Sequence, residues 1–141
     1  MPERDSTLTG KAPPPVGRYP HARRVGNLLF LSGLGPRDPA GGPIPGVTLD
    51  GNGRVVDHDI ELQTRAVLAN VRSVLEAAGS SWERLVDVTV FLTHMEQDFA
   101  TFNRVWAEHF PADPPCRTTV EINRLPTPIA IELKCIATVE T

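Results

Sequence analysis

Two stretches of the chain place apolar residues at the 3.6-residue period of an amphipathic helix. The first begins near Asp57 or Asp59, either of which can cap it, and ends at Gly79. Its apolar stripe consists of Ile60, Val67, Val71, Val74, Leu75 and Ala78. The second runs from about Asp98, a good N-cap residue, to Phe110, since Pro111 ends it. Its apolar face consists of Phe99, Phe102, Val105, Trp106, His109 and Phe110.

Other stretches carry the patterns of β-strands. Residues 22–25 and 28–32 predict a strand pair joined by a two-residue turn at Gly26-Asn27. The continuous apolar run in the second of these strands is typical of a strand that is buried on both faces. Residues 85–93 alternate polar and apolar side chains and predict a further strand. A strand, a helix and a strand in this order favour a right-handed parallel crossover.

Glycine and proline divide the rest of the chain. Residues 1–16 end in three prolines and lack apolar periodicity, so they predict a flexible N-terminal arm before one domain that spans residues 17–141. Residues 33–56 are so rich in glycine and proline that they predict a loop. A loop of this length is usually functional or part of an interface.

The last quarter of the chain contains the most suggestive charges. Residues 116–122 and 129–134 predict two neighbouring strands, separated by a loop with two prolines. Because side chains alternate along a strand, Arg117 shares its face with Thr119 and Glu121. Glu132 shares its face with Ala130 and Lys134 in the same way. Each strand therefore offers a charged face that would suit the floor of a polar pocket.

Two helices among about five strands cover only one face of a sheet. The strands are apolar on both faces, so the uncovered face needs a partner, which is most economically another copy of the chain. The pattern therefore predicts a sheet with two helices on one face and an obligate oligomer. Clefts between subunits are then natural places for a pocket.

Composition narrows the possible functions. The 141 residues include 14 Lys and Arg against 17 Asp and Glu, for a net charge of −3. A mildly acidic chain gives no support to nucleic acid or an anionic membrane as its main partner. No apolar run is long enough to be a signal peptide or to span a bilayer, which predicts a cytoplasmic location. Cys116 and Cys135 are read as small strand residues, without a disulfide or a zinc site.

Metal and cofactor sites are not predicted. His21, His58, His94 and His109 show no metal-binding spacing, so we expect no metal. The segment 32–36 follows a strand as a dinucleotide loop would, but it lacks the third glycine and a following helix, so we expect no cofactor. Cys116 as a nucleophile has no base placed beside it by the sequence.

Arg117 and Glu132 then remain as candidates for chemistry, with two readings. They can form an ordinary cross-strand ion pair on a half-exposed sheet. Alternatively, Arg117 binds a substrate carboxylate through its planar fork while Glu132 handles a water or a proton beside it. Hairpin geometry does not settle their register, and the pattern alone leaves both readings open.

Short motifs along the chain carry a resemblance to a known family. They are Gly17 with Tyr19, Gly26-Asn27 followed by Ser32-Gly33, Glu76-Ala77-Ala78-Gly79, Thr89-Val90-Phe91, Asp98-Phe99-Ala100-Thr101 with Asn103, Arg117 with Val120-Glu121, Arg124-Leu125-Pro126, and Ile131-Glu132 leading to Ala137. In this order they resemble the reactive-intermediate deaminases, the RidA or YjgF-like proteins. The resemblance implies a chorismate-mutase-like α+β fold and a homotrimer with inter-subunit sites. It also implies cofactor-free hydrolysis of reactive enamines and imines to 2-oxo acids and ammonia.

The resemblance also assigns positions. Arg117 matches the carboxylate-binding arginine and Glu132 the glutamate near the attacking water. Tyr19, Ser32 and Asn103 match the pocket wall, and Thr119, also expected to bind substrate, stands where many members have a cysteine.

Several features of the chain instead resemble the 2-aminomuconate deaminase branch, among them the segment at His21. In that reading His21 contacts a second carboxylate or transfers a proton, against the alternative of an exposed loop histidine. A non-catalytic binder of small carboxylates and a ribonuclease or chaperone-like protein are the alternative functions.

Overall fold

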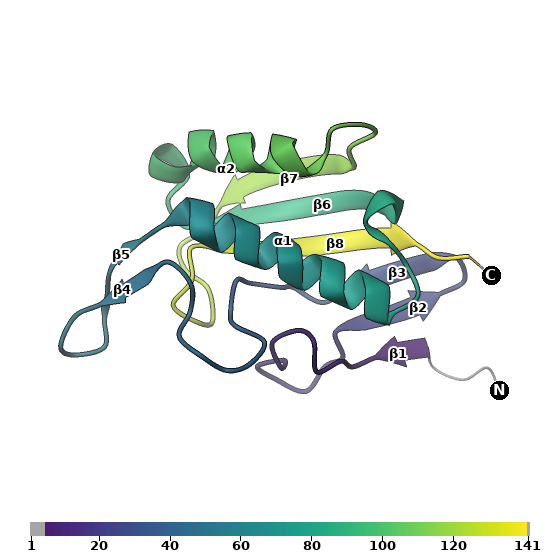
Figure 1. Cartoon of the computed structure of the whole chain (residues 1–141), viewed down its shortest axis with the longest axis horizontal. Helices are drawn as coiled ribbons and strands as arrows, with labels where there is room; N and C mark the ends of the chain where they lie inside the picture. Colours follow the sequence, from purple (N-terminus) through teal and green to yellow (C-terminus); the bar gives the residue numbers. More distant parts are fainter. Residues whose placement is uncertain (1–4, 141) are drawn as a thin grey trace.

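The protein is described by a computed structural model over residues 5–140, which fold into one mixed sheet with both helices on the same face (Figure 1). The order of strands across the sheet is β1-β2-β3-β8-β6-β7, and β4 and β5 form a separate hairpin. The elements in chain order are β1 (Asp5–Thr7), β2 (Ala22–Val25), β3 (Leu28–Leu31), β4 (Val47–Leu49), β5 (Val55–His58), α1 (Ile60–Ala77), a short 3-10 helix (Trp82–Arg84), β6 (Leu85–Leu92), α2 (Met95–His109), β7 (Cys116–Glu121) and β8 (Ile131–Thr138). The predicted α+β architecture is confirmed.

The strand pairing gives the sheet its mixed character. Neighbouring strands are antiparallel except β6 and β7, which are parallel and are joined by α2. β3 and β6 are both antiparallel to β8 and hence parallel to each other, so α1 also makes a parallel crossover. The predicted β2–β3 hairpin is confirmed, because Val25 pairs with Leu28 and Gly26 adopts a φ of 61°.

The two helices differ in how they begin. α1 is capped as predicted, since the backbone N–H of Leu62 donates to the Asp59 carboxylate at 3.1 Å. The prediction of Asp98 as the N-cap of α2 is wrong, because the helix begins at Met95. Glu121 of β7 caps its first turn instead, by accepting the Met95 N–H at 2.9 Å.

The prediction of a flexible arm over residues 1–16 does not fit the part of this segment that the structure describes. Residues 1–4 lie outside the described residues, but from Asp5 onward the chain forms β1, which pairs with β2, and Ala12 is buried. The His21 ring holds this segment at two points. The Thr9 N–H donates to Nδ1 at 3.1 Å, and Nε2 donates to the Pro13 carbonyl at 2.7 Å.

The prediction of a loop throughout residues 33–56 is partly wrong. The segment includes β4 and the start of β5, whose short hairpin was hidden by the surrounding glycines and prolines. The loop is also fixed to the domain. Leu34 bridges to Leu133 of β8, and the Asn70 side chain of α1 donates to the carbonyls of Gly35 and Arg37, both at 2.9 Å.

The prediction that the last two strands are neighbours is also wrong, because β6 lies between β7 and β8. Alternation in the sequence shows which segments are strands, but it does not show which strands pair. The loop over residues 122–130 therefore spans the width of β6 rather than forming a hairpin.

The two faces of the sheet are unequal. Side chains that face the helices, such as Val88, Val90 and Leu133, are almost completely buried. On the opposite face Phe30 and Phe91 are only half-buried. Since both helices lie on the first face, the second is the one for which the sequence predicts another copy of the chain. None of the helices in residues 5–140 is long and apolar enough to cross a membrane.

Candidate functional site

Arg117 lies on the helix-facing side of β7, beneath the aromatic residues of α2. Its guanidinium carbon is 5.8 Å from the ring centre of Phe99, 5.2 Å from that of Phe102 and 5.1 Å from that of Trp106. Such contacts favour the cation, whereas partial burial lowers the pKa of the Arg117 guanidinium. Among residues 5–140 no carboxylate forms an ion pair with Arg117, although ion pairs are formed by several other arginines in the same range.

Thr119 and Asn103 lie beside this arginine. Arg117 pairs with Val88 and Thr119 with Val90, both of which face the helices, so the two β7 side chains share that face. Asn103 is exposed on α2, one turn from both Phe99 and Trp106. We call Arg117, Thr119, Asn103 and the three aromatic residues the arginine half-site. It lies along the outer edge of the sheet, because β7 pairs only with β6 among the described strands.

Glu132 lies on the other face of the sheet, in β8. It is half-buried, and this burial raises the pKa of its carboxyl. Gly33 passes so close that an added Cβ would lie 2.7 Å from the Glu132 Oε2 atom, so a larger residue there would displace the carboxylate. A cavity of about 150 Å³ opens beside the carboxylate and is lined by Tyr19, Gly33, Arg37 and residues of the 126–129 loop, among others.

Hydrogen bonds hold the remaining predicted residues near Glu132. Ser32 lies next to Gly33 in the chain, and its hydroxyl donates to the Pro20 carbonyl at 2.7 Å. This bond fixes the segment that carries Tyr19, whose hydroxyl accepts the Val16 N–H at 3.2 Å. Tyr19 is 40% exposed and so remains accessible at the mouth of the cavity. We call Glu132, Gly33, Tyr19 and Ser32 the glutamate half-site.

One copy of the chain does not bring the two half-sites together. Arg117 and Glu132 lie on opposite faces of the sheet, on strands that β6 separates by about 10 Å. They also lie at different heights, since Glu132 pairs with Phe91 and Arg117 with Val88. The alternative of a cross-strand ion pair between Arg117 and Glu132 is therefore wrong.

His21 belongs to neither half-site. Its side chain is 2% exposed, and both ring nitrogens are occupied by the backbone of residues 9 and 13. Neither the predicted contact with a second carboxylate nor the alternative of an exposed loop histidine fits this position. The cation that does line the Glu132 cavity is Arg37. No periodicity or motif in its glycine-rich loop pointed to it.

The cysteines offer no nucleophile to this site. Cys135 is buried in β8, where burial raises the pKa of its thiol to about 12. Cys116 is exposed at the start of β7 and does not line the Glu132 cavity. The chemistry of the two half-sites is therefore that of one guanidinium, one carboxyl group and several hydroxyl and amide groups, with the Arg37 guanidinium beside the Glu132 cavity.

Comparison with known proteins shows which family the chain resembles. The chain matches the family described as Endoribonuclease L-PSP over residues 9–139. It is 42% identical over 130 residues to a RutC family protein of Pyrococcus horikoshii, covering 92% of this chain and 94% of that one. It is 36% identical over 136 residues to the chloroplastic Reactive Intermediate Deaminase A of Arabidopsis thaliana, covering 96% of this chain and 66% of the relative.

A solved structure agrees with these matches. The crystal structure of E. coli TdcF with bound serine superposes with a TM-score of 0.81 at 32% identity, covering 96% of this chain and 98% of that one. Sequence and fold thus point the same way, and the motifs noted above fall within the matched range. The chain belongs to the Endoribonuclease L-PSP family, which includes the RidA and YjgF-like proteins that its motifs resemble.

Proposed function

We propose that this protein is a cofactor-independent hydrolytic deaminase of reactive enamine or imine carboxylates, which it converts to 2-oxo acids and ammonia. One observation carries the proposal: the chain holds a guanidinium without an ion-pair partner among residues 5–140 and, on the opposite face, a half-buried glutamate beside a small cavity. The relative named Reactive Intermediate Deaminase A supports the reaction class. The bound serine in TdcF supports a small carboxylate as the ligand.

The complete site requires two copies of the chain. Because the half-sites lie on opposite faces of one sheet, the arginine half-site of one subunit meets the glutamate half-site of its neighbour. A homotrimer with cyclic symmetry repeats this contact three times and leaves no half-site unmatched. The half-buried apolar side chains on the open face of the sheet support such an assembly, because they gain cover when copies pack there.

Each charged residue has a separate role in the proposed reaction. Arg117 binds the substrate carboxylate through two parallel hydrogen bonds and fixes its orientation. Glu132 positions a water molecule and takes its proton as the oxygen adds to the imine carbon. The proton passes to the nitrogen and the C–N bond breaks, so an imine and one water give a 2-oxo acid and ammonia. Burial serves this role, since a carboxyl with a raised pKa accepts and returns a proton more readily near neutral pH.

Arg37 extends the proposal to the substrate. Substrates of the 2-aminomuconate type carry a second carboxylate, and His21 is not available to bind it. Arg37 lines the same cavity as Glu132 and provides a cation at a suitable place. We therefore assign the second carboxylate to Arg37 rather than His21.

Ammonia release from a panel of freshly generated substrates tests the proposed function. The panel contains 2-aminoacrylate-type imines and 2-aminomuconate, each compared with its spontaneous hydrolysis in buffer. We expect the protein to accelerate at least one member of the panel. No acceleration together with a thermal shift by 2-oxobutyrate would show a non-catalytic carboxylate binder. Salt-sensitive RNA binding or cleavage without any deamination would instead favour the ribonuclease reading, for which the net charge of −3 is unfavourable.

A further inference from the structure

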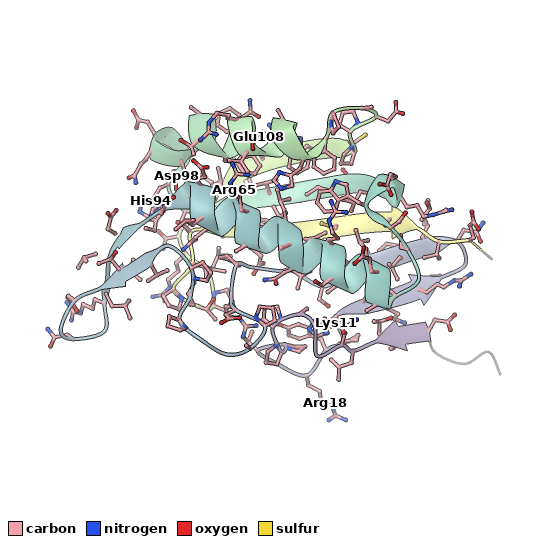
Figure 2. The ribbon with its side chains drawn as sticks, in the orientation of Figure 1. Lys11, Arg18, Arg65, His94, Asp98 and Glu108 are labelled. Atoms are coloured by element: carbon pink, nitrogen blue, oxygen red, sulfur yellow. The ribbon has the colours of Figure 1, made fainter. Side chains whose placement is uncertain are left out.

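A second cluster of titratable side chains lies at the N-terminal end of α2, where Figure 2 labels two of its members, His94 and Asp98. It consists of His58 at the end of β5, His94 at the N-cap of α2, and Asp98 in the first turn of that helix. Each residue offers one ligand atom, and these atoms all lie within 4.8 Å of one another. The sequence does not reveal the cluster, because folding brings His58 and Asp98 together from 40 residues apart.

Two of the three side chains are deeply buried. The His58 and Asp98 side chains are 6% and 2% exposed, and the His58 Nε2 lies 2.7 Å from the Asp98 Oδ2. A buried imidazole and a buried carboxylate joined by a hydrogen bond can instead bind one metal ion between them. The imidazole nitrogen must first lose the proton of that hydrogen bond. Unlike exposed acidic residues, they are held in place by their surroundings.

His94 provides the adjustable third ligand. Its ring centre lies 4.9 Å from that of His58, and its side chain is exposed. Its Nδ1 shares a hydrogen bond of 2.8 Å with the Thr93 hydroxyl, which leaves Nε2 free to coordinate. A histidine ligand commonly has such a partner on its second nitrogen, which fixes its tautomer and orientation.

We propose that His58, His94 and Asp98 bind a divalent transition-metal ion, with zinc as the best match to two imidazoles and a carboxylate. Zinc lies about 2.0–2.2 Å from such ligands, which places tetrahedral ligand atoms roughly 3.4 Å apart. The His58 and Asp98 atoms are 2.7 Å apart and would separate by about 0.7 Å to reach this distance, while the His94 ligand atom lies within 4.8 Å of both. The ion replaces the proton that lies between Nε2 and Oδ2.

The surroundings give the ion a path and an open coordination position. His58 and His94 line a cavity of about 350 Å³, together with Thr93, Arg124 and other residues of the 123–130 loop. His58 and Asp98 also line a second hollow, which is lined in addition by residues of α1 and α2. Three protein ligands leave the fourth position for water or a small anion. Neither cavity is lined by Arg117 or Glu132, so this site is separate from the proposed deaminase site.

Metal titration of the full-length, untagged protein tests the proposal. After dialysis against a chelator, zinc binding is measured by calorimetry, and Co²⁺ is added as a spectroscopic probe of coordination by nitrogen and oxygen. We expect one zinc per chain with a Kd of about 1 µM or tighter. His94→Ala is the decisive variant, because the ring is exposed and makes no capping bond, so the fold is retained. It should weaken zinc binding by at least tenfold.

Two further variants complete the test. Asp98→Asn keeps the shape of the buried pair but removes its charge, and it should also lose at least tenfold in zinc affinity. His109→Ala is the matched control, because this histidine lies on the same helix and bonds to the Val105 carbonyl, away from the cluster. Its affinity should equal that of the wild type. Absence of stoichiometric zinc binding, or equal affinity in wild type and His94→Ala, overturns the proposal.

Discussion

The arginine and glutamate half-sites are built by opposite means within the same sheet. The arginine half-site is packed: a strand and a helix fix Arg117 against three aromatic rings, with no hydrogen bond to the guanidinium from residues 5–140. The glutamate half-site is instead shaped by the close approach of the Gly33 backbone to Glu132. A hydrogen bond from Ser32 holds the segment that carries Tyr19. Packing fixes a position while leaving the donors of the guanidinium available to a ligand. Close backbone approach instead shapes a small cavity around a carboxyl group.

The same comparison indicates why we expect neither half-site to catalyse the proposed reaction alone. Each charge is partly removed from water without an ion-pair partner among residues 5–140, which is unfavourable for a single chain. In the proposed reaction, a substrate carboxylate compensates Arg117, and a proton from water or ammonia compensates Glu132. Perturbed groups of this kind are typical of functional sites, and here they are divided between two faces.

The largest effect is expected from Glu132→Gln, which keeps the shape of the side chain but cannot take a proton. We expect kcat for ammonia release to fall by about 10²- to 10⁴-fold, the range typical of a lost general base. The measurement is the initial rate on the best substrate of the panel. Glu83→Gln, at an exposed position of the 3-10 helix, is the control and should retain full activity. Full activity in Glu132→Gln would remove Glu132 from the mechanism.

The next effect is expected from Arg117→Ala, which removes the carboxylate clamp. We expect kcat/KM to fall by about 100-fold, which corresponds to about 2.7 kcal/mol of lost binding. Arg117→Lys should recover only part of it, because an ammonium group lacks the planar fork. The exposed Arg54→Ala is the control for a lost positive charge. A wild-type rate in Arg117→Ala would disprove the assignment of the arginine half-site.

Features that depend on local patterns, such as the surroundings of Arg117, are easier to predict from the sequence than features that depend on long-range pairing. The α1 cap at Asp59 and the β2–β3 hairpin depend on neighbouring residues, and the structure confirms both. By contrast, the placement of β6 between β7 and β8 depends on long-range pairing that alternation does not encode. The residues around Arg117 follow from a helix stripe and one strand, which are local patterns.

The positions of two residues near the glutamate half-site were missed for the same physical reason. Arg37 reaches the cavity because Asn70 of α1 holds its loop, and His21 is buried because the N-terminal segment folds over it. Both contacts join residues far apart in the sequence. Asp98 was read as a helix cap for a similar reason, since its partner His58 lies on a different element.

A smaller effect is expected from Arg37→Ala, and it depends on the substrate. If Arg37 binds a second carboxylate, KM for 2-aminomuconate should rise by about tenfold, equivalent to about 1.4 kcal/mol. The KM for substrates with one carboxylate should stay within about twofold, because they offer Arg37 no second carboxylate to bind. Steady-state kinetics on both substrates in parallel measure the difference. An equal rise for both would mean that Arg37 supports the cavity rather than selecting the substrate.

Mixing the two inactive variants tests whether the half-sites come from different subunits. In trimers co-expressed from equal amounts of Arg117→Ala and Glu132→Gln, about one quarter of the inter-subunit sites combine an intact arginine with an intact glutamate. About one quarter of wild-type activity should therefore return. If both residues acted from the same chain, no site would be intact and the mixture would be as inactive as its parts. Mass spectrometry of the purified trimers verifies that the chains have mixed.

The smallest effect is expected on stability, and it runs opposite to the effect on activity. Burial raises the pKa of Glu132, so the ionised form is disfavoured in the folded protein. The resulting loss of stability begins as the pH rises through the ordinary glutamate range and is complete above the raised pKa. Glu132→Gln removes this cost, and we expect it to raise Tm at pH 7 by about 2 °C. The gain should vanish below the ordinary pKa, where both side chains are neutral. A lower Tm for Glu132→Gln at pH 7 would mean that the folded protein stabilises the ionised carboxylate, which would contradict a glutamate held by burial for proton transfer.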